Sequence, residues 1–215
     1  MRRRTFGILL ILIGCIIIGM AFYISYMGER KQKELLAEYE RVLYKIGQDT
    51  MEDNGAASSG DERDAVAVDN NLENNPEEVK SAGENNKAIA ILEIPRIELT
   101  VAVVQGTEPK DLKYAVGHFE NTAMPGENGN FCVAGHRSYT YSEYFNRLDE
   151  LEKGDKIIAK TEKGTFEYEV YEKTVVEPTE VAVLEPTKEA TITLVTCTPI
   201  RVATHRLIIK GRLMQ

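Results

Sequence analysis

Three features of common protein classes are missing from this 215-residue sequence. It has no glycine-rich phosphate loop, no paired spacing of metal ligands and no basic segment concentrated enough to suggest nucleic-acid binding. These absences argue against nucleotide-phosphate chemistry, a metal centre and a nucleic-acid partner. The net charge is −8, but most of the excess acidity falls in residues 49–87. The negative net charge therefore comes mainly from that segment and says little about a binding site.

Cysteine is also scarce, with three in the whole chain. Cys15 lies in a long apolar run, which leaves Cys132 and Cys197 for the rest of the sequence. Cys132 sits in the strand-like run 130–134, where a small buried thiol is the common fate of cysteine. We therefore expect two free thiols rather than a disulfide, and a count this low is compatible with a location outside the cell.

Residues 6–27 form a run without a single charge. At about 1.5 Å per residue in a helix, such a run spans roughly 33 Å, enough to cross a hydrocarbon core. A cleavable signal peptide has a shorter apolar region and ends in a small-x-small site, whereas this run ends in Tyr, Ser, Tyr and Met. The pattern predicts a single membrane anchor. Arg2, Arg3 and Arg4 place residues 1–5 in the cytoplasm and everything after Met27 outside.

Two segments of opposite character follow the predicted anchor. Residues 28–48 carry an apolar stripe at helical spacing, formed by Leu35, Leu36, Tyr39, Val42, Leu43 and Ile46. This predicts an amphipathic juxtamembrane helix that packs on the following domain, on lipid or on a second copy of itself. Residues 49–87 are rich in acids, Asn, Gly and Ser and have no aromatic residue, which predicts a disordered, extended tether.

Residues 88–215 read as strands almost throughout. Short runs rich in Val, Ile, Thr, Tyr and Phe alternate with Gly and Pro, and only 109–114 and 142–151 resemble short helical turns. The predicted strands are 88–94, 99–104, 130–134, 156–161, 165–176, 191–196 and 206–212. Many short strands in a domain of this size predict a mostly β fold, a single closed or nearly closed β-barrel.

Three residues of this domain have the chemistry for acyl transfer at a peptide bond. Cys197 ends a predicted strand and is followed by Pro199, which favours an exposed thiol nucleophile over a core thiol. Arg206 begins the next strand, so a short connection places the two side chains together at the rim of the barrel. His136 is the candidate acid or base. Strand alternation puts His205 on the face opposite Arg206, so we expect His205 to be structural.

The motifs around these residues resemble those of a known family, the sortases, which are cysteine transpeptidases of Gram-positive cell surfaces. The matching segments are MPGENGNFCVAGHR at 124–137, TLVTCTP at 193–199 and RLII at 206–209. The resemblance covers about 88–213. It implies an eight-stranded barrel in which Cys197 is the nucleophile, His136 the general acid or base, and Arg206 a positioner of the substrate backbone and stabiliser of the oxyanion.

The resemblance also implies the reaction and its partners. An LPxTG-like sorting signal would be cut after Thr, leaving a thioester on Cys197, and an amine of the cell-wall precursor or of a pilin lysine would release it. His118 matches a position where related sortases place a histidine near the site, and we expect it to pack or to support the site. Thr196, next to the nucleophile, is expected to shape the oxyanion region. Oligomeric state is left open.

No cofactor is expected. Some sortases use calcium, and the carboxylates near the penultimate loop suit a solvated loop better than a calcium site. These carboxylates are Glu177, Glu180, Glu185 and Glu189.

The subclass has two interpretations. The segments 196–199 and 204–207 are similar to pilin-polymerising class C enzymes. Class C enzymes usually carry an Asp-Pro-aromatic lid before the barrel and often a second anchor after it, and this sequence shows neither. Its Ala-Met-Pro-Gly turn at 123–126 looks more like class D.

Two further functions stay open. An L,D-transpeptidase is another cysteine acyltransferase of the wall, but its Ser-x-Gly-Cys-x-Arg motif is absent. A non-catalytic scaffold that binds sorting signals would have no evident need for Cys197, His136 and Arg206 together.

Overall fold

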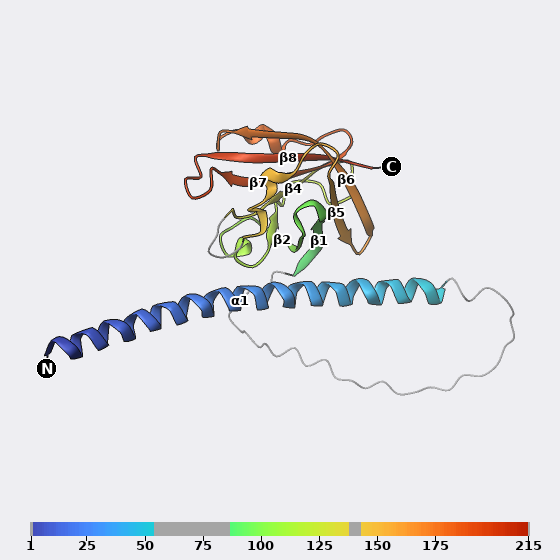
Figure 1. The fold of residues 1–215 in the computed structure, drawn as a ribbon. Coiled ribbons are helices and arrows are strands. Elements are labelled where there is room, and N and C mark those ends of the chain that lie inside the picture. The colour runs from blue at the N-terminus through green and yellow to red at the C-terminus, as the bar shows by residue number, and fades with distance from the viewer. Residues whose placement is uncertain (1, 54–86, 138–142, 215) are drawn as a thin grey trace, which may run out of the picture.

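Eight strands close into a barrel in this computed structural model, which describes residues 2–53, 87–137 and 143–214 (Figure 1). The strands follow one another round the ring in the order β1-β2-β3-β4-β7-β8-β6-β5. Their bounds are β1 Ala88–Ile94, β2 Leu99–Gln105, β3 Val116–His118, β4 Gly129–Ala134, β5 Lys156–Thr161, β6 Gly164–Val176, β7 Ala190–Thr198 and β8 His205–Leu213. The predicted closed eight-stranded barrel is therefore confirmed.

Neighbouring strands are antiparallel except for two pairs, β2–β3 and β4–β7. The β4–β7 pair matters for function, because parallel strands end at the same edge of a sheet. The interior is filled by alternate side chains that have no exposed surface, among them Phe131 and Val133 of β4, Leu194 of β7 and Ile209 of β8. Side chains between these positions point outward, so each wall has a dry face and an outer face.

The sequence pattern located seven of the strands to within two residues at each end and missed β3. With three residues, β3 is too short to show an alternating pattern. The predicted turns appear as 3-10 helices: η2 Asp111–Lys113 within 109–114, and η3 Glu143–Phe145 and η4 Leu148–Glu150 within 142–151. The two others are η1 Pro95–Ile97 and η5 Val181–Leu184. The connection from β7 to β8 is residues 199–204, short as the pattern suggested.

The amino-terminal part is one continuous helix, α1 Arg2–Asp53, which contains the predicted anchor and the predicted juxtamembrane helix. Its stretch Leu12–Lys45 includes a segment long and apolar enough to cross a membrane. The predicted tether begins inside this helix, and its part at 54–86 lies outside the described residues.

Part of the apolar stripe of α1 packs on the barrel, one of the three partners that its sequence allowed. Leu35 and Leu36 lie against Ala102 and Val104 of β2, and Tyr39 is buried. Figure 1 shows α1 lying along the β1 and β2 side, with β7 and β8 on the far side. The ring order agrees, since β7 lies four places from β1 in a ring of eight. The helix therefore leaves the wall that carries Cys197 uncovered.

Candidate active site

Cys197 and Arg206 are direct neighbours across the β7–β8 ladder. Both belong to the outer face, because the residues that alternate with them, such as Leu194 of β7 and Leu207 of β8, lie in the core. Cys197 is partly exposed, as a thiol must be to meet a substrate. The short 199–204 turn and the antiparallel register together bring Cys197 and Arg206 side by side, as the strand pattern predicted.

His136 follows β4, the other neighbour of β7. Ala134 pairs with Val195, and the ladder continues beyond the strand, because the Gly135 N–H donates to the Val195 carbonyl at 3.1 Å. The Thr196 hydroxyl also donates to the Gly135 carbonyl at 2.7 Å. Continuing this parallel register by two residues beyond the Ala134–Val195 pair sets His136 beside Cys197 on the outer face. The order across that face is then His136, Cys197 and Arg206.

A glycine directly before His136 lets a buried aromatic ring close on the chain. Phe145 of η3 has no exposed surface, and a Cβ added to Gly135 would lie 2.5 Å from its ring. The Phe145 N–H donates to the His136 carbonyl at 3.2 Å. The Gly135–His136 pair is thus explained by packing: the glycine admits Phe145, and η3 then holds the backbone of His136.

Arg137 ties the same loop to the end of β7, a contact that the sequence did not predict. Its side chain is 6% exposed and lies 2.7 Å from a carboxylate oxygen of Asp149. It also donates to the Thr198 hydroxyl at 3.0 Å and to the Asn146 carbonyl at 3.1 Å. Because Arg137 follows His136 and Thr198 follows Cys197, this one guanidinium links the two candidate catalytic positions. In the sequence, only the position of Arg137 directly after His136 pointed to a role near the site.

Burial decides the protonation of two groups near this wall. It lowers the pKa of His136 from the ordinary value of 6.5, so the imidazole is neutral at pH 7. The same effect raises the pKa of the Cys132 thiol to about 12. Cys132 also has no exposed surface, so it is an inert core thiol, and Cys132 and Cys197 are both free of disulfides.

The Arg206 guanidinium is held by its own turn. One nitrogen, Nη1, donates to the Ala203 carbonyl at 3.2 Å and to the His205 carbonyl at 3.0 Å. Within the described parts of the chain, its remaining N–H groups have no hydrogen-bond partner. Arginine stays charged at any accessible pH, so these groups can donate to a carbonyl oxygen or an oxyanion placed over Cys197.

The outer face of β4 and β7 is covered at one end only. Asn130 donates to the carbonyls of Val183 and Glu185, which fixes η5 over the start of β4. Toward Cys197 the same face carries Ala134 and Val195, both partly exposed. A short apolar strip therefore leads from η5 to the thiol, suited to an extended peptide.

The other predicted residues lie apart from the outer face. His118 is buried on the inner face of β3, against the Phe131 ring at 5.1 Å. Its Nδ1 lies 3.1 Å from the Gln105 amide oxygen, and its Nε2 lies 3.1 Å from the Ala123 carbonyl oxygen. Thr196 is also buried and inward, and acts on the site through Gly135. His205 pairs with Glu177 at 3.1 Å, on the rim.

The carboxylates considered for calcium are scattered along the β6–β7 connection. Glu177 faces His205, and Glu189 lies 3.5 Å from the Nε atom of Arg212. In the described ranges no three His, Cys, Asp or Glu side chains are grouped closely enough to hold a metal ion.

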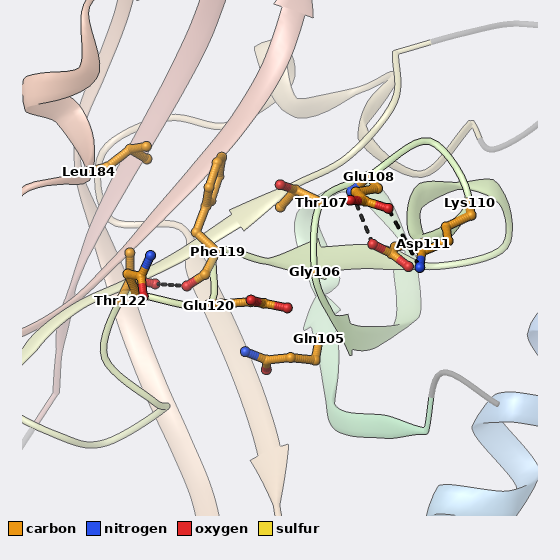
Figure 2. A pocket seen from close by; sticks show the side chains of 11 residues that line it. Gln105, Gly106, Thr107, Glu108, Lys110, Asp111, Phe119, Glu120, Thr122 and Leu184 are labelled. Atoms are coloured by element: carbon orange, nitrogen blue, oxygen red, sulfur yellow. Dashed lines mark hydrogen bonds and ion pairs between the residues drawn. The ribbon is translucent and has the colours of Figure 1, made fainter. Parts of the chain in front are cut away.

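A separate pocket of about 650 Å³ lies at the end of β2, among the loops that follow β2 and β3 (Figure 2). Its lining includes Gln105, Phe119 and Thr122, and Glu108 with Asp111, which are joined by a hydrogen bond of 3.0 Å. The Phe119 N–H donates to the Cys132 carbonyl, four residues before His136. At about 3.3 Å per strand residue, the pocket lies on the order of 13 Å along β4 from His136, so it is not part of the Cys197 site.

A partly exposed thiol between a neutral imidazole and a guanidinium has the groups that a cysteine acyltransferase needs. The comparisons with known proteins name the family. A family profile for the sortase domain matches residues 92–214, and the chain belongs to the sortase family of cysteine transpeptidases.

Several relatives agree with this assignment. Sortase D of Bacillus subtilis (strain 168) is 37% identical over 134 residues, which are 60% of this chain and 65%, just under two thirds, of that protein. Sortase A of Bacillus anthracis is 27% identical over 208 residues, 97% of this chain and 92% of that protein. The structure of a Clostridium perfringens Sortase D5 transpeptidase is 40% identical with a TM-score of 0.56, covering 60% of this chain and 80% of that one.

Proposed function

We propose that this protein is a membrane-anchored sortase that attaches surface proteins to an amine of the cell-wall precursor. It cleaves an LPxTG-like sorting signal after Thr and carries the protein as a thioester on Cys197. The observation that supports this most is the pairing of Cys197 with Arg206 across the β7–β8 ladder, with His136 two residues beyond the last paired residue of β4, the other neighbour of β7. The anchor is α1, with its amino terminus in the cytoplasm and the barrel outside.

The reaction follows from the groups on this face. His136 is neutral at rest, so it takes the proton of the Cys197 thiol as the sulfur attacks the Thr carbonyl carbon. Arg206 donates to the resulting oxyanion. The Thr–Gly bond breaks, and His136 passes its proton to the leaving amine. An incoming amine then attacks the thioester, loses a proton to His136 and expels the Cys197 thiolate, which regains that proton. No metal takes part in these steps.

A class D enzyme is the subclass that we propose. The relatives named Sortase D and Sortase D5 share 37% and 40% identity with this chain, more than the 27% of the Bacillus anthracis Sortase A. The acceptor is then a wall-precursor amine, and a pilin lysine is the competing acceptor that the test below distinguishes.

Intact mass spectrometry of the full chain in detergent tests the function directly. Incubation with LPxTG-like peptides should add an acyl mass on Cys197, and diglycine should convert the adduct to a new amide. Release by a lysine peptide but not by diglycine would indicate a pilin-type acceptor. Cys197→Ala should abolish the adduct, whereas the buried thiol gives a matched control, because Cys132→Ala should leave it intact. A folded protein with a free Cys197 thiol and no adduct would favour the non-catalytic scaffold.

A further inference from the structure

The contact between α1 and the barrel is made at two polar points with an apolar patch between them. Gln32 donates from its amide to the Thr100 carbonyl at 3.1 Å. Tyr39, 5% exposed, donates from its hydroxyl to the Ile89 carbonyl at 2.6 Å. Leu35 and Leu36 pack between them against the small residues of β2. Two separated hydrogen bonds fix the direction of the barrel along the helix as well as its attachment.

The direction of β1 relative to α1 follows from the positions of the two hydrogen-bond acceptors, the carbonyls of Thr100 and Ile89. Thr100 pairs with Glu93 near the end of β1, and Ile89 is near its beginning. Gln32 is closer than Tyr39 to the apolar run 6–27, so the end of β1 points toward the anchor. β1 therefore runs opposite to α1.

The strand directions carry this orientation round the barrel to the active site. β2 is antiparallel to β1 and runs away from the anchor, and β3 is parallel to β2. β4 is antiparallel to β3 and returns toward the anchor, and β7 is parallel to β4. His136 and Cys197 follow or lie at the ends of these two strands, and Arg206 is near the start of β8. Figure 1 agrees, because the carboxyl terminus after β8 lies on the side away from the amino terminus of α1.

We propose that α1 holds the catalytic end of the barrel toward the bilayer, so that the enzyme takes sorting signals and acceptor amines presented at the lipid surface. The proposal rests on the membrane anchor of the proposed function. At about 1.5 Å per helical residue, Gln32 lies roughly 8 Å and Tyr39 roughly 18 Å beyond the end of the apolar run at Met27. The docked barrel is thus attached close to the surface, with its substrate face on the wall opposite the helix.

Energy transfer to the lipid surface measures this orientation in the full chain. The protein is reconstituted in phosphatidylglycerol–phosphatidylethanolamine vesicles that carry an acceptor dye on outer-leaflet headgroups. In a Cys15→Ser background, a membrane-impermeant maleimide dye labels Cys197, because Cys132 is buried and protonated. A second protein carries the dye at the other end of the same outer face, through Arg212→Cys with Cys197→Ala. Cys197 pairs with Arg206, six residues before Arg212 on β8, so the two dye positions are about 20 Å apart along the strands.

Transfer from position 197 should exceed transfer from position 212. Equal transfer, or greater transfer from 212, would overturn the proposal. Leu36→Lys should remove most of the difference by releasing the barrel, whereas Ala37→Lys, which adds the same side chain at an exposed neighbouring position, should preserve it. A difference that survives Leu36→Lys would show that α1 does not set the orientation.

Activity and flotation separate this proposal from the proposed function. Leu36→Lys should keep the parent's rate of adduct formation with a soluble peptide, which shows a folded site, and should lose any preference for a peptide coupled to lipid. Protein that fails to float with the vesicles would contradict the anchor itself. If the protein floats with the vesicles and shows the predicted energy transfer but forms no acyl adduct, the orientation is supported and the transpeptidase activity is contradicted.

Discussion

At the scale of residues, the outer face of β4, β7 and β8 carries three candidate catalytic side chains with three different properties. Cys197 is exposed enough to react, Arg206 keeps its charge, and burial keeps His136 neutral. The inward neighbours, Thr196 and Leu207, are buried and hold the strands in place. Because side chains alternate along a strand, the outer face carries the candidate catalytic groups and the inner face carries the buried residues that stabilise the barrel.

Arg206→Lys tests whether the shape of this cation matters beyond its charge. Lysine keeps the charge but loses the planar fork that bonds its own turn and reaches an oxyanion. We expect kcat/KM for peptide cleavage to fall by on the order of 100-fold, as for loss of an oxyanion donor. Arg212→Lys is the matched control on the same strand and face, and its kcat/KM should stay at the parent value. Near-parent activity in Arg206→Lys would contradict the role.

His118 makes the fold sensitive to acid. Burial lowers its pKa from 6.5, so below that pH the unfolded chain binds a proton that the folded chain resists. The free energy of unfolding should fall as the pH drops below 6.5, until the pH passes the folded-state pKa. His118→Gln should flatten part of this slope in urea unfolding between pH 7 and 5. His136→Gln should flatten another part, because its pKa is also lowered. An unchanged slope in both variants would contradict this account.

At the scale of elements, the sequence pattern was sufficient for the strands and insufficient for the loops. Alternation and glycine or proline boundaries predicted β1 and β5 residue for residue, and the order of motifs brought Cys197 beside Arg206. The buried position of Arg137 was not predictable in the same way. Its partners Asp149 and Thr198 are 12 and 61 residues away, and no local pattern encodes such pairings.

Arg137→Lys measures what the loop after β4 contributes to catalysis. Lysine cannot hold Asp149, Thr198 and the Asn146 carbonyl in one plane, so His136 should lose its fixed position relative to Cys197. Misplacement of a catalytic group should lower kcat by roughly 10-fold to 100-fold with little change in KM. Arg147→Lys, an exposed arginine of the same loop that pairs with Glu150, is the control and should leave kcat unchanged. Equal effects of the two variants would indicate general loosening of the loop.

At the scale of the whole molecule, the helix and the active site occupy opposite walls of one barrel. β1 and β2 carry α1, whereas β4, β7 and β8 carry the candidate catalytic residues. Stability contributed by the helix and chemistry contributed by the far wall should therefore be separable. A comparison of two soluble fragments, 28–215 and 88–215, tests that separation.

Removal of residues 28–87 uncovers Ala102, Val104 and Ala115, which Leu35 and Leu36 cover in the intact chain. At about 25 cal/mol for each Å² of apolar surface, the lost burial amounts to a few kcal/mol. We expect fragment 88–215 to melt on the order of 5–10 °C below fragment 28–215. Both should cleave a soluble peptide with the same kcat/KM, because α1 packs on β1 and β2 whereas His136, Cys197 and Arg206 lie on or beside β4, β7 and β8. Leu36→Lys in the longer fragment should reproduce much of the lower Tm without a change in kcat/KM. A fall in kcat/KM that accompanies the lower Tm would mean that the two walls are coupled through the barrel core.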